Sequence, residues 1–119
     1  MNADNNVTRS APCIPVSWPT EAWSKVGIDI VGELSDVPES KRFVITLIDY
    51  HSRWPEIHFC RNVTSRVVIS FLIDMFTKHG IPDTVVTDNG KQFVSVEFEQ
   101  FLADCDIRHV KASLYYPQS

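Results

Sequence analysis

Two aspartates in this sequence stand where a bound divalent cation would explain them. Asp29 lies inside the apolar run VGIDIV (residues 26–31), and Asp88 follows the run TVVT (residues 84–87). An ionised carboxylate in an apolar strand is costly to bury unless it is paired or coordinates a metal. Aspartate is a hard oxygen ligand that suits magnesium, and two adjacent carboxylates repel each other without a cation. We therefore expect Asp29 and Asp88 to lie side by side at one edge of a five-stranded sheet, as ligands of Mg²⁺ or Mn²⁺.

Each aspartate also has an ordinary structural explanation. Asp29 could be paired with a lysine or with backbone donors. The tripeptide DNG (residues 88–90) between two apolar stretches is the strongest short signal for a hairpin turn. Against a hairpin, apolar residues recur at three- and four-residue spacing between Ser95 and Cys105, which favours a turn from a strand into a helix.

The elements that must hold these aspartates follow from the periodicity of the apolar residues. Residues 26–31 alternate and predict a strand, residues 42–50 predict a central strand covered on both faces, and residues 54–60 predict a third strand in an antiparallel meander. A helix is expected from Thr64 or Ser65 to the His79-Gly80 pair, then a strand at 84–88, a helix from Ser95 and a strand at 107–112. This order is α/β, with helices free to cover both faces of one mixed five-stranded sheet.

Length and composition restrict the partners of the domain. The chain has 119 residues, enough for one domain, and residues 1–20 read as a proline-containing linker into a domain at 21–119. The formal charge is −4, so any contact with DNA must be local. The odd cysteine count of three, without C-x-x-C spacing, indicates free thiols in a reducing compartment. No apolar run is long enough for a membrane span, and no targeting signal is visible.

Four sequence blocks together resemble a known family. They are WSKVGIDI (residues 23–30), LIDYHSRWPE (47–56), TDNGKQF (87–93) and YYPQS (115–119). They are similar in order and spacing to the integrase catalytic core of gypsy-type retrotransposons and retroviruses, over about residue 18 to the end. The resemblance implies a ribonuclease-H-like fold, with the first aspartate on the first strand and the second just after the fourth. It also implies metal-dependent polynucleotidyl transfer, in which the 3′ end of element DNA is processed and joined to target DNA.

The resemblance assigns roles to particular residues. Asp29 and Asp88 correspond to catalytic, metal-binding carboxylates. The family's third group is a glutamate on a helix after the Pro-Gln-Ser loop, and the sequence stops at Ser119, so we expect the C-terminal helices to be missing and this chain to be catalytically incomplete. The implied partners are element and target DNA and, for a full-length protein, further copies of itself in the nucleus. The DNA-binding positions would be Asn89, Gly90, Gln92, Tyr115, Tyr116, Pro117, Gln118 and Ser119.

Other conspicuous residues have structural interpretations. Gly90 could shape the loop at the metal site or simply permit a positive φ angle. Asp49 is expected to fix a turn through Ser52 or backbone donors. Glu97 and Glu99 are expected to complement the dipole of the second predicted helix. Packing, in preference to base stacking, is the role expected of three aromatic residues, Trp23, Trp54 and Phe93.

Two further functions stay open on the sequence. One is a domesticated transposon remnant that binds nucleic acid or protein without catalysis, which the acidic charge and the missing glutamate favour. The other, more distant, is a ribonuclease H or a related nuclease with the same fold. The TDNG and YPQS blocks resemble integrases more than ribonucleases.

Overall fold

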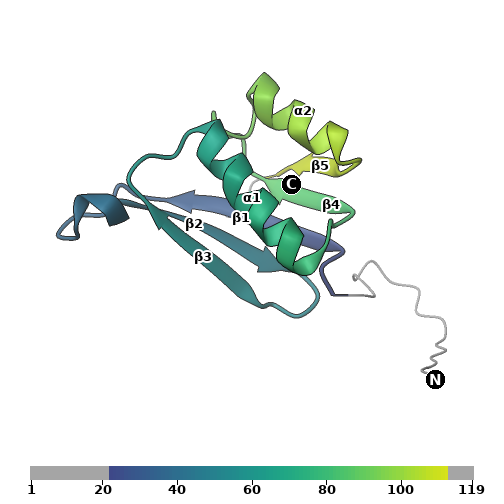
Figure 1. Cartoon of the computed structure of the whole chain (residues 1–119), viewed down its shortest axis with the longest axis horizontal. Helices are drawn as coiled ribbons and strands as arrows, with labels where there is room; N and C mark the ends of the chain where they lie inside the picture. Colours follow the sequence, from purple (N-terminus) through teal and green to yellow (C-terminus); the bar gives the residue numbers. More distant parts are fainter. Residues whose placement is uncertain (1–21, 113–119) are drawn as a thin grey trace.

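The first half of the chain forms an antiparallel meander, as the alternating apolar residues predict. The structure is a computed structural model that describes residues 22–112 (Figure 1). Strand β1 (Lys25–Val31) pairs with β2 (Phe43–Asp49), and β2 pairs with β3 (Pro55–Cys60). A short 3₁₀ helix, η1 (Glu39–Lys41), lies in the long connection between β1 and β2.

Each of the two α-helices within residues 22–112 begins directly after a residue whose side chain caps it. In α1 (Ser65–His79), the Thr64 hydroxyl accepts a hydrogen bond from the backbone N–H of Val67 at 3.2 Å. The helix ends at Gly80, whose φ of 99° is accessible to glycine at little cost. In α2 (Val96–Asp104), Ser95 caps the backbone N–H of Phe98 at 3.1 Å. Neither helix within residues 22–112 is long and apolar enough to span a membrane.

The second half of the chain adds two parallel strands to the other side of β1. Strand β4 (Thr84–Thr87) pairs with β1, and β5 (Arg108–Lys111) pairs with β4. The sheet therefore has the order β3-β2-β1-β4-β5 and is mixed, as expected. Asp88 leads from β4 toward α2, so the strand-to-helix turn is confirmed and the hairpin alternative is wrong.

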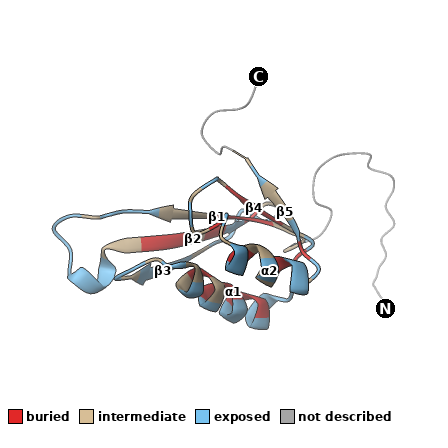
Figure 2. Ribbon diagram, turned by 90° about the horizontal axis from the view of Figure 1, so that it is seen from above, coloured by how far each residue is buried: buried red, intermediate tan, exposed pale blue. Residues whose placement is uncertain are grey.

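Within the described part of the chain, both helices pack on one face of the sheet (Figure 2). The expectation that β2 is covered on both faces is wrong here, because Ile48 on the opposite face is 38% exposed. The core lies between that one face and the helices, where fourteen buried residues pack together. They are Val26, Ile28, Ile45, Leu47, Val68, Phe71, Leu72, Met75, Phe76, Val85, Phe93, Phe98, Leu102 and Ile107.

The three aromatic residues expected to pack differ in their burial. Phe93 is 1% exposed and belongs to the core, and Trp23 is partly buried against the core. Trp54 is 61% exposed, so its predicted packing role is wrong, and its indole N–H donates to Glu56 at 2.8 Å. Trp54 directly precedes β3, which is an edge strand of the sheet. No further described strand pairs with β3, so solvent can reach the indole. The expected linker at residues 1–20 lies outside the described residues.

The turn after β2 is organised by Asp49, as the sequence suggests. Asp49 is 3% exposed, and its Oδ2 accepts a hydrogen bond from the Ser52 hydroxyl at 2.7 Å. Its Oδ1 accepts from the backbone N–H groups of Trp23 at 3.0 Å and His51 at 3.1 Å. Burial by itself would raise the pKa of Asp49, but these hydrogen bonds stabilise the anion and hold the pKa below its ordinary value of 3.8.

We predict that Asp49 makes folding acid-sensitive. Because its pKa is lower in the folded state, its ionisation stabilises the fold above the unfolded pKa, and this contribution is lost as the pH falls below about 4. Asp49→Asn should lower the free energy of unfolding by about 1–3 kcal/mol at pH 7 and flatten its acid dependence. Urea unfolding at pH 7, 5 and 3 measures both effects. The exposed Asp74→Asn is the matched control and should change little.

Candidate functional site

The pairing of β1 with β4 brings the two sequence-predicted aspartates to the same place. The parallel register matches Lys25 with Thr84 and Gly27 with Val86. Continued by two residues, this register sets Asp88 opposite Asp29, on strands about 4.8 Å apart. Because residues two apart in a strand share a face, Asp29 lies on the face opposite the core residue Ile28, which the helices leave open, and Asp88 follows β4 level with it. Asp29 lies on β1 and Asp88 directly follows β4, which are both inner strands, so the predicted location at an edge of the sheet is wrong.

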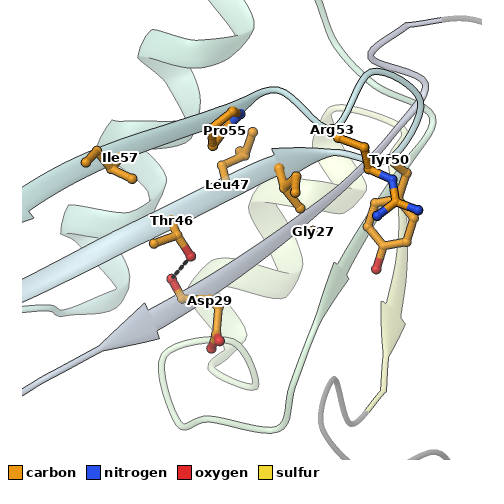
Figure 3. Close-up of a pocket in the computed structure, with 9 residues that line it drawn as sticks. Gly27, Asp29, Thr46, Leu47, Tyr50, Arg53, Pro55 and Ile57 are labelled. Atoms are coloured by element: carbon orange, nitrogen blue, oxygen red, sulfur yellow. Dashed lines mark hydrogen bonds between the residues drawn. The ribbon is translucent and has the colours of Figure 1, made fainter.

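Asp29 is half-buried and lines a groove of about 500 Å³ on the open face. Its Oδ1 accepts a hydrogen bond from the backbone N–H of Ile30 at 2.9 Å, and its carbonyl oxygen lies 3.5 Å from the Thr46 hydroxyl. Figure 3 shows the Asp29 carboxylate pointing away from β2, which carries Thr46. The side chain is therefore directed toward the side of β1 on which β4 lies.

The loop after β4 holds Asp88 in a tight turn. The Asp88 Oδ1 accepts a hydrogen bond from the backbone N–H of Gly90 at 2.8 Å. Gly90 has no positive φ, so the conformational explanation for this glycine is wrong. A β-carbon there would instead lie 3.0 Å from Asp88 Oδ1 and 3.5 Å from Gln92 Oε1. Gly90 is therefore suited to the loop because it lets the backbone approach the carboxylate closely.

Gln92 fastens the same loop to the start of α1. Its side-chain amide donates to the backbone carbonyl of Val63 at 2.9 Å. The backbone carbonyl of Gln92 accepts from the hydroxyls of Ser65 and Ser95, each at 3.3 Å. Asn89 is exposed beside it. DNA contact by Asn89, Gly90 and Gln92 stays a prediction, and the predicted positions Tyr115, Tyr116, Pro117, Gln118 and Ser119 lie outside the described residues.

The donor set suits part of a magnesium site. Asp29 and Asp88 supply carboxylate oxygens, which are the ligands that Mg²⁺ prefers. Among residues 22–112, no three histidine, cysteine, aspartate or glutamate side chains gather closely enough to complete a metal site. Burial raises the pKa of the free thiols of Cys60 and Cys105, which argues against either as a thiolate ligand. The described part therefore offers two hard ligands.

A polar network beside Asp88 was not anticipated from the sequence. Glu99 on α2 contacts the Lys111 ammonium at 2.6 Å and the His109 Nδ1 at 2.7 Å, both across to β5. These two partners, Lys111 first, lower the pKa of Glu99. The prediction that Glu99 serves the helix dipole was thus incomplete. Helical and strand periodicity place each residue on an element, but neither shows that α2 packs beside β5.

A comparison with protein families matches residues 19–117 of the chain to the integrase core domain. Among known proteins, the uncharacterized protein K02A2.6 of Caenorhabditis elegans is 28% identical over 98% of this chain and 9% of its own length. The Gag-Pol polyprotein of avian reticuloendotheliosis virus is 32% identical over 66% of this chain and 7% of its own length. The chain thus spans less than a tenth of these relatives.

Solved structures show the same fold. The catalytic core domain of HTLV-2 integrase in complex with magnesium, in a trimeric form, has a TM-score of 0.68 at 23% identity, over 76% of this chain and 60% of that one. A chain of the simian T-cell lymphotropic virus intasome in complex with a PP2A regulatory subunit has a TM-score of 0.69 at 22% identity, over 78% of this chain and 35% of that one. The fold is therefore ribonuclease-H-like. With its fold and the match over residues 19–117, this chain belongs to the integrase core domain family.

Proposed function

We propose that this chain supplies the aspartate half of a DNA integrase active site, in which Asp29 and Asp88 bind Mg²⁺ or Mn²⁺. The observation that carries the proposal is the parallel β1–β4 register, which, continued by two residues, sets Asp88 opposite Asp29. The family match and the magnesium-bound HTLV-2 relative support it. The reactions proposed for the whole protein are 3′-end processing and DNA strand transfer.

The two aspartates are held for metal binding in different ways. Asp29 is held by a strand with partners on both sides, so its carboxylate is placed rigidly. Asp88 is held by the Gly90 N–H, which sets the orientation of its carboxylate while leaving acceptor capacity for a cation. When bound, divalent cations lower the pKa of the attacking water or 3′-hydroxyl and stabilise the leaving oxygen. A further acidic ligand would have to come from outside residues 22–112.

The partners proposed for the whole protein are element-end and target DNA, together with further copies of the protein. The relatives support this part, since one is an intasome chain and another is a trimeric core domain. The net charge of −4 argues that DNA phosphates are met locally, at the metal site and the neighbouring loop. A nuclear location of the whole protein is part of the same proposal.

We predict that Asp88→Asn removes the response to metal and preserves the fold. The asparagine side-chain oxygen can still accept from the Gly90 N–H, and one of two repelling charges is lost, so the melting temperature without metal should stay the same or rise. A ligand that binds the folded state stabilises it in proportion to the logarithm of its concentration. Thermal melts in EDTA and in 1–50 mM Mg²⁺, about the range for weak sites, measure this response.

Two variants serve as controls for this experiment. Asp88→Ala removes both the metal ligand and the acceptor of the Gly90 N–H. It should therefore be about 1 kcal/mol less stable than Asp88→Asn. Asp83→Asn neutralises an exposed aspartate just before β4 and should keep the full metal response. Stabilisation by Mg²⁺ that survives Asp88→Asn unchanged would contradict the metal assignment.

We also predict that DNA binding depends on metal. A short DNA duplex should bind the chain more tightly in Ca²⁺ or Mg²⁺ than in EDTA, since the carboxylates alone repel phosphates. Fluorescence anisotropy at low salt measures the difference, which Asp29→Asn and Asp88→Asn should abolish. Equal binding in metal and EDTA would favour a module that binds nucleic acid without catalysis.

A further inference from the structure

A continuous line of hydrogen bonds runs from the surface of α2 to the backbone of Asp88. Glu99 contacts the His109 Nδ1 at 2.7 Å, and the His109 Nε2 contacts the Thr87 hydroxyl at 2.7 Å. The Thr87 hydroxyl in turn donates to the carbonyl oxygen of Asp88 at 2.8 Å. Lys111 closes the outer end by pairing with Glu99. Three elements, α2, β5 and β4, thereby converge on the residue that leaves the sheet at the metal site.

The inner members of this line are shielded from water. Thr87 is fully buried, and the His109 side chain is 8% exposed and lies edge-on against the ring of Phe98. A buried hydroxyl or imidazole that loses its partner costs more than an exposed one, because no water replaces the bond. The arrangement is therefore strongly preferred over alternatives in which Thr87 or His109 turns elsewhere.

The number of hydrogens in the line restricts how its contacts form. The Glu99 carboxylate can only accept, so the His109 Nδ1 must donate to it. The Thr87 hydroxyl has a single hydrogen, which the Asp88 carbonyl receives. The 2.7 Å contact with the His109 Nε2 is the second interaction of this hydroxyl, and it holds the Thr87 oxygen between β5 and the Asp88 carbonyl.

We propose that His109 and Thr87 are positioning residues for the metal site, acting together to fix the backbone of Asp88 where β4 ends. The proposal rests on the proposed function of Asp88 as a metal ligand. Fixing the Asp88 carbonyl fixes the peptide that begins the turn, and with it the Gly90 N–H that orients the carboxylate. Neither His109 nor Thr87 is proposed as a catalytic residue, because both act on the site only through the Asp88 backbone carbonyl.

The test compares Thr87→Val with Thr87→Ser. Valine keeps the shape of threonine and removes the hydroxyl, whereas serine keeps the hydroxyl and removes the methyl group. We expect Thr87→Val and His109→Phe to weaken Mg²⁺ affinity about tenfold, as loss of an outer hydrogen bond does at other metal sites. Thr87→Ser should stay within about twofold of the unsubstituted chain. Calorimetric titration well below the melting temperature of each variant separates affinity from stability.

A second measurement needs no metal. Amide hydrogen exchange of Gly90 in EDTA reports whether the turn around Asp88 is held. We expect exchange to speed up about tenfold in Thr87→Val and to stay unchanged in Thr87→Ser. Equal Gly90 exchange in these two variants would overturn the positioning role. A chain that binds no Mg²⁺ but shows the exchange difference would overturn the proposed function and leave the positioning role supported.

Purely structural behaviour would look different in both measurements. If the line of hydrogen bonds only stabilises the fold, Thr87→Val lowers the melting temperature while the Mg²⁺ affinity and Gly90 exchange of the folded chain match those of Thr87→Ser. That result would contradict the proposal.

Discussion

The parallel pairing of β1 with β4 is the constraint on which the rest of the site depends. Asp29 and Asp88 are fifty-nine residues apart, and their alignment comes from the register of three paired positions. That register is maintained from one side by α1 and α2, whose apolar faces pack against Val26, Ile28 and Val85. Since each of these three valine or isoleucine side chains is fully buried, a slip of one residue would turn them to solvent and separate the aspartates.

Asp49 and Asp88 differ in how far the protein's own hydrogen-bond donors satisfy their carboxylates. Asp49 is almost fully buried, and three donors use both of its oxygens to stabilise the turn after β2. Asp88 is only half-buried and accepts from Gly90 through one oxygen. A carboxylate surrounded by donors is satisfied by the protein, whereas a less saturated one beside a second carboxylate is suited to a cation.

The loop between β4 and α2 has no helix or strand, but several contacts anchor it to the rest of the domain. Gly90 allows close approach to Asp88, Gln92 bonds to the residues before α1, and Phe93 enters the core. On the opposite side, His109 and Thr87 hold the point where the loop leaves the sheet. The loop that carries Asp88 is thus supported from α1, α2 and β5 at once.

The sequence pattern alone was sufficient to predict the features that depend on residues close together in the chain. Periodicity, caps and turn residues predicted the strands and helices, a first cap at Thr64 or Ser65, the Ser95 cap and the role of Asp49, because these features rest on contacts within a few residues. The four blocks indicated the family. Tertiary structure alone decided that both described helices cover one face, that Trp54 is exposed, that Gly90 serves close approach, and that Glu99, His109 and Thr87 are linked. Each of these depends on how distant elements pack, and a one-dimensional pattern does not contain the packing of α2 against β5.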